Sequence, residues 1–140
     1  MHYLSTRNNS LKKTFYEVLF QGLSKDGGLF LPSEWPKINI NDLEGKSYQE
    51  VALSIIYPYL KEDLSKQKLD EIIHLSYENF RNETVAPIIN FEKNKYTLEL
   101  FHGPTFAFKD YALQFLGNLF NFFSKKINKK ITILGATSGD

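Results

Sequence analysis

Polar capping residues and apolar residues at helical spacing dominate the first half of the chain. Thr14 and Glu17 stand three residues apart, as in a capping box, where a hydroxyl and a carboxylate satisfy free main-chain amides at a helix start. The helix predicted after Thr14 carries one apolar face, made of Phe15, Val18, Leu19 and Leu23. The turn at 26–28 should then lead into a short extended segment at 29–32.

A second capping box and a further apolar stripe predict two more helices. Ser47 and Glu50 repeat the capping spacing, and Pro58 should kink or end the helix that follows. Ser65 precedes an apolar stripe that extends to Phe80. Up to about residue 80 the chain is therefore predicted to be mostly helical, with apolar faces that serve for packing.

The pattern changes near Pro87. Two short apolar segments, 87–91 and 96–101, flank a polar tetrapeptide and predict a hairpin. A long helix is expected from about 109 to 126, with one face formed by Ala112, Leu116, Leu119 and Phe123. The unbroken apolar run 131–134 is typical of a strand buried on both sides of a parallel sheet.

The order of these elements predicts an α/β fold. Residues 96–140 give strand, loop, helix, strand and loop, which is one βαβ unit of right-handed connection. We expect a mostly helical domain at 1–82 and the beginning of an α/β domain at 83–140. Both loops follow the carboxyl ends of strands, the edge at which open α/β sheets bind ligands.

Composition narrows the class of protein. The 140 residues carry 17 basic and 16 acidic side chains. This balance lacks the excess of basic side chains that is typical of proteins that bind nucleic acid or an anionic membrane surface. The lysines at 125–130 fit a helix end better than a binding patch. Without cysteine there is no disulfide, and three scattered histidines give no expected metal site. The chain opens without an apolar leader, and its longest uncharged stretch, 111–124, is too short to span a bilayer, so we expect a cytoplasmic protein.

Lys109 is the first candidate for chemistry. It stands at the predicted first turn of a helix, where the partial positive charge of the helix opposes an ammonium group. Burial beside Phe106 and Phe108 would add to this effect and favour the neutral amine, which attacks aldehydes. The spacing alone favours a solvent-exposed lysine that is balanced by Asp110.

The final loop and a histidine are further candidates. Thr137, Ser138, Gly139 and Asp140 follow the predicted buried strand, where small hydroxyl residues and free amides can form an anion cradle. A polar turn with a helix N-cap is the alternative. His102 could act as a general base, or could be structural, with its ring hydrogen-bonded to the main chain.

Three segments resemble the threonine synthase family. The opening MHYLSTR with the later SKDGGLFLP is similar to the family's start, apart from Asn8, where glycine is expected. Residues 99–110, ELFHGPTFAFKD, resemble its attachment segment for pyridoxal 5′-phosphate (PLP). Residues 136–140, ATSGD, resemble its next signature loop.

The resemblance implies roles for these residues. Lys109 would carry PLP covalently and act as general base and acid, while Thr137, Ser138 and Gly139 would bind the substrate carboxylate. Asp140 would face the cofactor. The implied fold is a helical N-terminal segment followed by the first βαβ portion of a fold-type-II PLP enzyme. The implied reaction turns O-phospho-L-homoserine and water into L-threonine and phosphate, with no part for metal, nucleic acid or membrane.

Two alternatives remain open. A threonine-synthase-like phospho-lyase would share the Lys109 segment and release a keto acid. A non-catalytic truncated module is the other, because the resemblance implies that the loop for the PLP phosphate lies beyond Asp140. We accordingly expect the 140 residues to be inactive by themselves.

Overall fold

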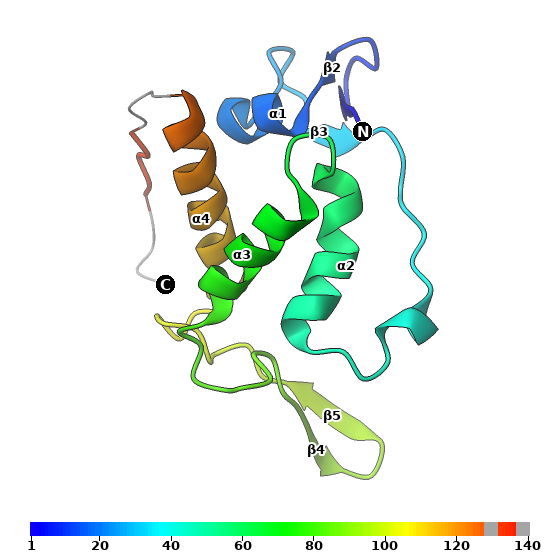
Figure 1. The fold of residues 1–140 in the computed structure, drawn as a ribbon, viewed down its shortest axis with the longest axis vertical. Coiled ribbons are helices and arrows are strands. Elements are labelled where there is room, and N and C mark those ends of the chain that lie inside the picture. Colours follow the sequence, from blue (N-terminus) through cyan, green and yellow to red (C-terminus); the bar gives the residue numbers. More distant parts are fainter. Residues whose placement is uncertain (128–131, 137–140) are drawn as a thin grey trace. The chain divides into compact units, whose positions relative to one another are not determined.

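The computed structural model describes residues 1–127 and 132–136. It combines helices with two small sheets (Figure 1), which confirms the predicted α/β class. The chain divides into two compact units, Met1–Glu71 and Ile72–Asp140. The functional division that we place between residues 82 and 83 stays a prediction. None of the helices within the described residues is long and apolar enough to cross a membrane.

The first unit contains a small antiparallel sheet. β1 (Tyr3–Ser5) is its central strand, between β2 (Lys12–Lys13) and β3 (Phe30–Pro32). The extended segment at 29–32 is thus confirmed, whereas the sequence pattern did not reveal the other two strands. Strands of two or three residues are too short to show an alternating pattern.

A tight turn fixes the end of this sheet. Asp26 accepts hydrogen bonds from the Ser5 hydroxyl at 2.8 Å and from the Gly28 amide at 2.9 Å. Both hydrogen bonds lower the pKa of Asp26, and the one from Gly28 has the larger effect. A Cβ at Gly28 would lie 2.3 Å from the Ser5 oxygen, and Gly27 has φ +78°, so the turn requires both glycines.

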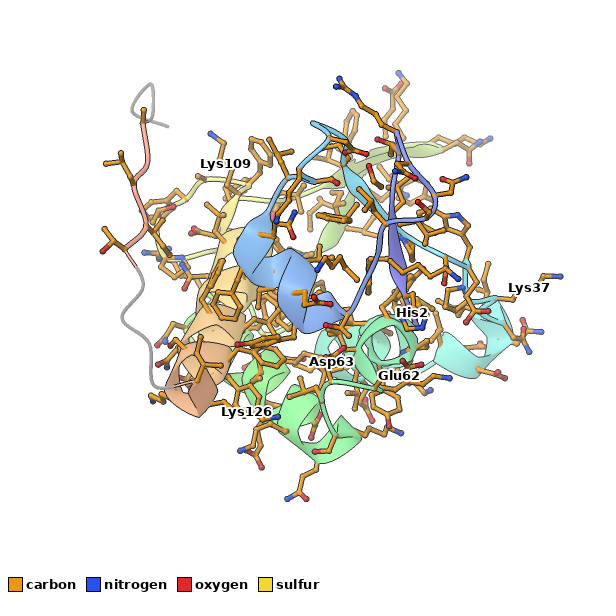
Figure 2. The ribbon with its side chains drawn as sticks, turned by 90° about the horizontal axis from the view of Figure 1, so that it is seen from above. His2, Lys37, Glu62, Asp63, Lys109 and Lys126 are labelled. Atoms are coloured by element: carbon orange, nitrogen blue, oxygen red, sulfur yellow. The ribbon has the colours of Figure 1, made fainter. Side chains whose placement is uncertain are left out.

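The N-terminus is held within the same unit. The hydroxyl of the buried Tyr3 donates to the carbonyl of Tyr59 at 3.0 Å, and burial raises the pKa of Tyr3 to about 12. The amino group of Met1 forms an ion pair with Glu62, whose pKa it lowers by hydrogen bonding. Figure 2 shows Glu62 next to His2 at the base of β1.

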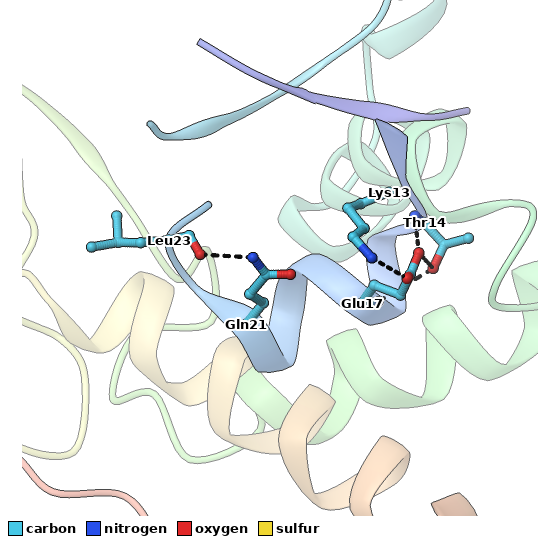
Figure 3. Close-up of polar contacts among 5 residues, drawn as sticks. All are labelled: Lys13, Thr14, Glu17, Gln21 and Leu23. Atoms are coloured by element: carbon cyan, nitrogen blue, oxygen red, sulfur yellow. Dashed lines mark hydrogen bonds and ion pairs between the residues drawn. The ribbon is translucent and has the colours of Figure 1, made fainter. Parts of the chain in front are cut away.

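Helix α1 (Phe15–Gln21) begins with the predicted capping box (Figure 3). The Thr14 hydroxyl accepts from the Glu17 amide, and the Glu17 carboxylate accepts from the Thr14 amide and pairs with Lys13 at 2.6 Å. The helix ends at Gly22, which has φ +69°. Leu23 therefore lies outside the helix and is 60% exposed, so its predicted place on the apolar face is wrong.

The remaining helices of this region begin as predicted, but the third ends at Tyr77, so Phe80 lies outside it. After the 3-10 helix η1 (Ile40–Leu43), helix α2 (Tyr48–Leu60) starts with the second capping box at Ser47 and ends two residues after Pro58. Helix α3 (Lys66–Tyr77) follows Ser65, whose hydroxyl accepts from the Lys68 amide at 3.3 Å. The buried apolar residues of the first unit include Leu60, Leu64 and Leu69.

The second unit combines the end of α3 with a hairpin and a long helix. β4 (Ile88–Glu92) and β5 (Lys95–Leu98) form the predicted antiparallel hairpin, whose residues are all exposed. Helix α4 (Asp110–Ile127) follows the loop 99–109. The core of the unit is made of Ile72, Ile73, Tyr77, Val85, Leu119 and Phe123.

Tyr111 connects the segments of the second unit. Its hydroxyl donates to the carbonyl of Val85 at 2.7 Å, its own carbonyl accepts from the Tyr77 hydroxyl at 2.9 Å, and its ring meets that of Phe80 edge to face. The start of α4 is thereby attached to the end of α3 and to the turn that precedes β4.

One prediction about this unit is confirmed only in part, and another is wrong. On α4, Leu119 and Phe123 are buried, but Ala112 and Leu116 are exposed. Residues 132–134 form no strand; Ile133 and Leu134 are 72% and 96% exposed. A parallel strand needs hydrogen-bonded neighbours. Among the described residues β5 pairs with β4 in a two-stranded sheet that does not include 132–134. The second strand of the predicted βαβ unit is therefore not formed there.

Candidate active site

Lys109 lies directly before α4 and is partly exposed. Its side chain lines an open hollow of about 570 Å³, together with Thr105, Phe106, Ala107, Asp110, Leu113 and Gln114. Figure 2 shows Lys109 at the N-terminal end of α4 and Lys126 near the opposite end. A primary amine therefore stands at the edge of a space large enough for a small molecule.

The surroundings of Lys109 differ from those predicted. Phe106 and Phe108 are 62% and 60% exposed, so they do not bury the amine. The Lys109 nitrogen lies 5.6 Å from the centre of the Phe108 ring, within reach of a cation–π contact. Of the two features expected around the amine, burial is absent, and the position directly before a helix is present.

Asp110 is buried and connects the loop to α4. Its carboxylate accepts from the amide and hydroxyl of Thr105, at 2.8 and 2.9 Å, and from the Gln114 side chain at 3.2 Å. Burial acts to raise the pKa of Asp110, but the hydrogen bonds from Thr105 and Gln114, with the charge of Arg81, together outweigh it, and the pKa is lowered. The ionised carboxylate thus holds the loop in front of Lys109.

Gly103 makes a close approach to this carboxylate. A Cβ at position 103 would lie 2.4 Å from the Cβ of Asp110, which no side chain tolerates. The Gly-Pro step in the sequence therefore has a packing reason here, namely contact between the loop and the first turn of α4.

Arg81 holds the other side of the loop. Its guanidinium donates to the carbonyl oxygens of Gly103 and Pro104 and lies 4.0 Å from the centre of the Phe106 ring. Sequence reasoning missed this residue. One signal was present: Arg81 is one of only two arginines in the sequence.

His102 is fixed by a side chain rather than by the main chain. Its Nε2 lies 2.7 Å from an Oε atom of Glu99, and its ring packs 4.7 Å from that of Phe101. The histidine and Lys109 thus belong to the same loop, but the contact with Glu99 gives His102 a structural partner.

The second predicted loop cannot be placed beside Lys109. Thr137, Ser138, Gly139 and Asp140 lie outside the described residues. The described part of the site is therefore an amine, an open hollow and a loop held by hydrogen bonds. Its chemistry is that of a lysine that can form an imine with an aldehyde.

Comparison with known proteins identifies the chain's relatives. Residues 2–77 match the family model described as threonine synthase N terminus, which is more than half of the 140 residues. Threonine synthases of Schizosaccharomyces pombe and Saccharomyces cerevisiae are 43% and 42% identical over 99% of this chain. The match covers 29% and 30% of those two proteins, so the chain spans about three tenths of their length.

Solved structures give the same result. A PLP-bound threonine synthase from Brucella melitensis superimposes with a TM-score of 0.89 at 37% identity, over 93% of this chain and 29% of that one. The yeast threonine synthase gives a TM-score of 0.85 at 39% identity, over 91% of this chain and 27% of that one. From the family match and these similarities, we conclude that the chain belongs to the threonine synthase family.

Proposed function

We propose that this chain is part of a PLP-dependent threonine synthase, in which Lys109 binds the cofactor covalently. The complete protein would convert O-phospho-L-homoserine and water to L-threonine and phosphate. The observation that carries the proposal is the position of Lys109 at the edge of a hollow at the start of α4. It lies within a chain that superimposes on a threonine synthase that binds PLP.

The described residues fit such a cofactor. An aldehyde needs a lysine that it can reach, and Lys109 is partly exposed at the hollow. A flat pyridine ring needs space and an apolar wall, which the 570 Å³ hollow with Phe106 and Leu113 would provide. When bound, PLP would supply an electron sink for negative charge at the substrate carbon.

Residues of the chain itself would bind the substrate, transfer protons and position the loop. The Lys109 amine would bind the aldehyde and later move protons to and from the substrate carbon atoms. Thr137, Ser138 and Gly139 would bind the substrate carboxylate through hydroxyl groups and amides, and Asp140 would face the cofactor. Asp110 would keep the loop before Lys109 in place through its bonds to Thr105.

The proposal is tested by replacing the lysine in the protein expressed from its complete gene. Lys109→Ala should abolish covalent PLP attachment, measured by borohydride reduction and peptide mass spectrometry, and should remove the visible absorbance of the bound cofactor. Lys126→Ala, at the exposed far end of the same helix, is the matched control and should keep both signals. PLP attached to another lysine in Lys109→Ala would contradict the assignment.

The product distinguishes the proposed reaction from the phospho-lyase alternative. The unchanged protein should release phosphate and threonine in equal amounts from O-phospho-L-homoserine. A relative named threonine synthase-like 2 from Xenopus laevis is 36% identical to this chain. Release of a keto acid in place of threonine would favour the alternative of a phospho-lyase.

We also propose that the complete protein works in the cytoplasm on this small substrate. The near-neutral charge balance offers no surface for nucleic acid or an anionic membrane. Cell fractionation followed by immunodetection tests the location. Recovery of the protein in a membrane or organelle fraction would contradict it.

A further inference from the structure

One arginine contacts several residues of the loop that precedes Lys109. The main-chain amide of Arg81 donates to the carbonyl of His102 at 2.9 Å. Its guanidinium reaches the carbonyl of Gly103 and, at 3.3 Å, that of Pro104. The planar guanidinium has several donors in a fixed arrangement, so one side chain can hold two successive carbonyl groups.

The loop contains a strained residue that needs such support. Phe106 has φ +64°, in the left-handed region that bulky side chains rarely adopt. A conformation of this kind persists only where the surroundings enforce it. The guanidinium of Arg81 lies 4.0 Å from the Phe106 ring, and Thr105, the preceding residue, is held by Asp110.

We infer that Arg81 is a positioning residue for Lys109. It fixes the main chain from His102 to Phe106, and so sets the direction from which the Lys109 amine enters the hollow. Arg81 itself is not among the residues that line the hollow, so it acts through the loop. The inference rests on the proposed function of Lys109.

The test uses the protein expressed from its complete gene, first freed of PLP. Three variants are compared with the unchanged protein: Arg81→Ala, Arg81→Lys and the control Arg7→Ala. Arg7 is exposed, and its guanidinium donates to the carbonyl of Asp26 at 3.1 Å in the first unit. Added PLP is trapped by borohydride at timed intervals, and the adduct at Lys109 is quantified by mass spectrometry. Amide hydrogen exchange of residues 102–110 and circular dichroism are recorded before PLP is added.

Arg81→Ala should slow trapping at Lys109 by about ten-fold to a hundred-fold, because small displacements of a reacting group have effects of this size. Amide exchange should accelerate at 102–110, while the circular dichroism spectrum stays that of the folded protein. Arg81→Lys keeps the charge but not the paired donors and should give an intermediate rate. If Arg81→Ala does not fold, the comparison of Arg81→Lys with the unchanged protein provides the test. Arg7→Ala should match the unchanged protein.

Equal trapping rates in the folded Arg81 variants and in Arg7→Ala would overturn the inference. A loss of trapping that only follows the unfolded fraction would overturn it as well. Failure of the proposed function has a different signature, namely no adduct at Lys109 in the unchanged protein. In that case the exchange data decide whether Arg81 holds the loop, and unchanged exchange at 102–110 would show that it does not.

Discussion

Single contacts around Asp110 determine the form of the candidate site. Its carboxylate is buried and receives three hydrogen bonds. The Asp110 side chain also lies against Gly103, where a Cβ atom would have no room. A buried charge is tolerated only when its hydrogen bonds are made. The loop and the first turn of α4 therefore depend on each other. Lys109 lies at the junction between them, directly before α4.

Gly103→Ala tests this close approach. The added methyl group would lie 2.4 Å from the Asp110 Cβ, so the loop must move, and we expect a loss of about 1–3 kcal/mol in the free energy of unfolding. Gly117→Ala is the matched control, because a Cβ there would meet no described atom within 4 Å apart from its chain neighbours and the backbone of its own helix. It should stabilise α4 by about 0.5–1 kcal/mol. Urea titration measures both, and equal effects would contradict the packing explanation.

Asp110→Asn tests the charge. The folded-state pKa of Asp110 lies below the unfolded value of about 3.9, so its contribution to stability is present above that pH. The contribution is lost as the pH falls through the lower folded-state pKa. The unchanged protein should thus exceed Asp110→Asn in stability most at pH 7, and the difference should shrink below about pH 4. Urea titrations at pH 7 and pH 3 that give the same difference would contradict this.

At the scale of elements, caps define where the helices begin. Both capping boxes form as predicted, at Thr14 with Glu17 and at Ser47 with Glu50. These pairs need only four consecutive residues, so the local sequence is sufficient to specify them. The exit of α1 is local as well, since Gly22 supplies the positive φ that ends it.

Ser47→Ala tests the cap of α2. The change leaves the Glu50 amide without its acceptor and should cost about 1 kcal/mol of folding free energy. Ser54→Ala makes the same replacement inside the helix, where alanine is the better helix former, and should stay within about 0.5 kcal/mol of the unchanged protein. Thermal unfolding followed by circular dichroism compares the two. A larger loss at Ser54 would mean that the cap is not the stabilising feature.

At the scale of the whole molecule, the described residues leave much apolar surface exposed in the second unit. The residues of the hairpin are all exposed, and so are Phe101, Phe106, Phe108 and Leu113. Single exposed apolar residues are ordinary, but so many in one unit are not. The chain also spans only about three tenths of the yeast and S. pombe threonine synthases.

The 140-residue chain, tested as a separate protein, should therefore release no phosphate from O-phospho-L-homoserine, even with added PLP. The hollow beside Lys109 is open, and catalysis requires a site that excludes water and fixes the substrate. A malachite-green assay measures phosphate, with the protein from the complete gene as the positive control. Turnover by the 140 residues above the Lys109→Ala background would contradict this prediction.

The sequence by itself determined the local features of this protein. Helix starts, the hairpin, the lysine at the head of α4 and the family resemblance all depend on residues close together in the chain. Tertiary structure decided what depends on distant partners. The two short strands β1 and β2, the exposed half of α4 and the missing strand at 132–134 follow from which segments meet. The same holds for Arg81, which lies 22 residues from Gly103 and reaches it only in the folded chain.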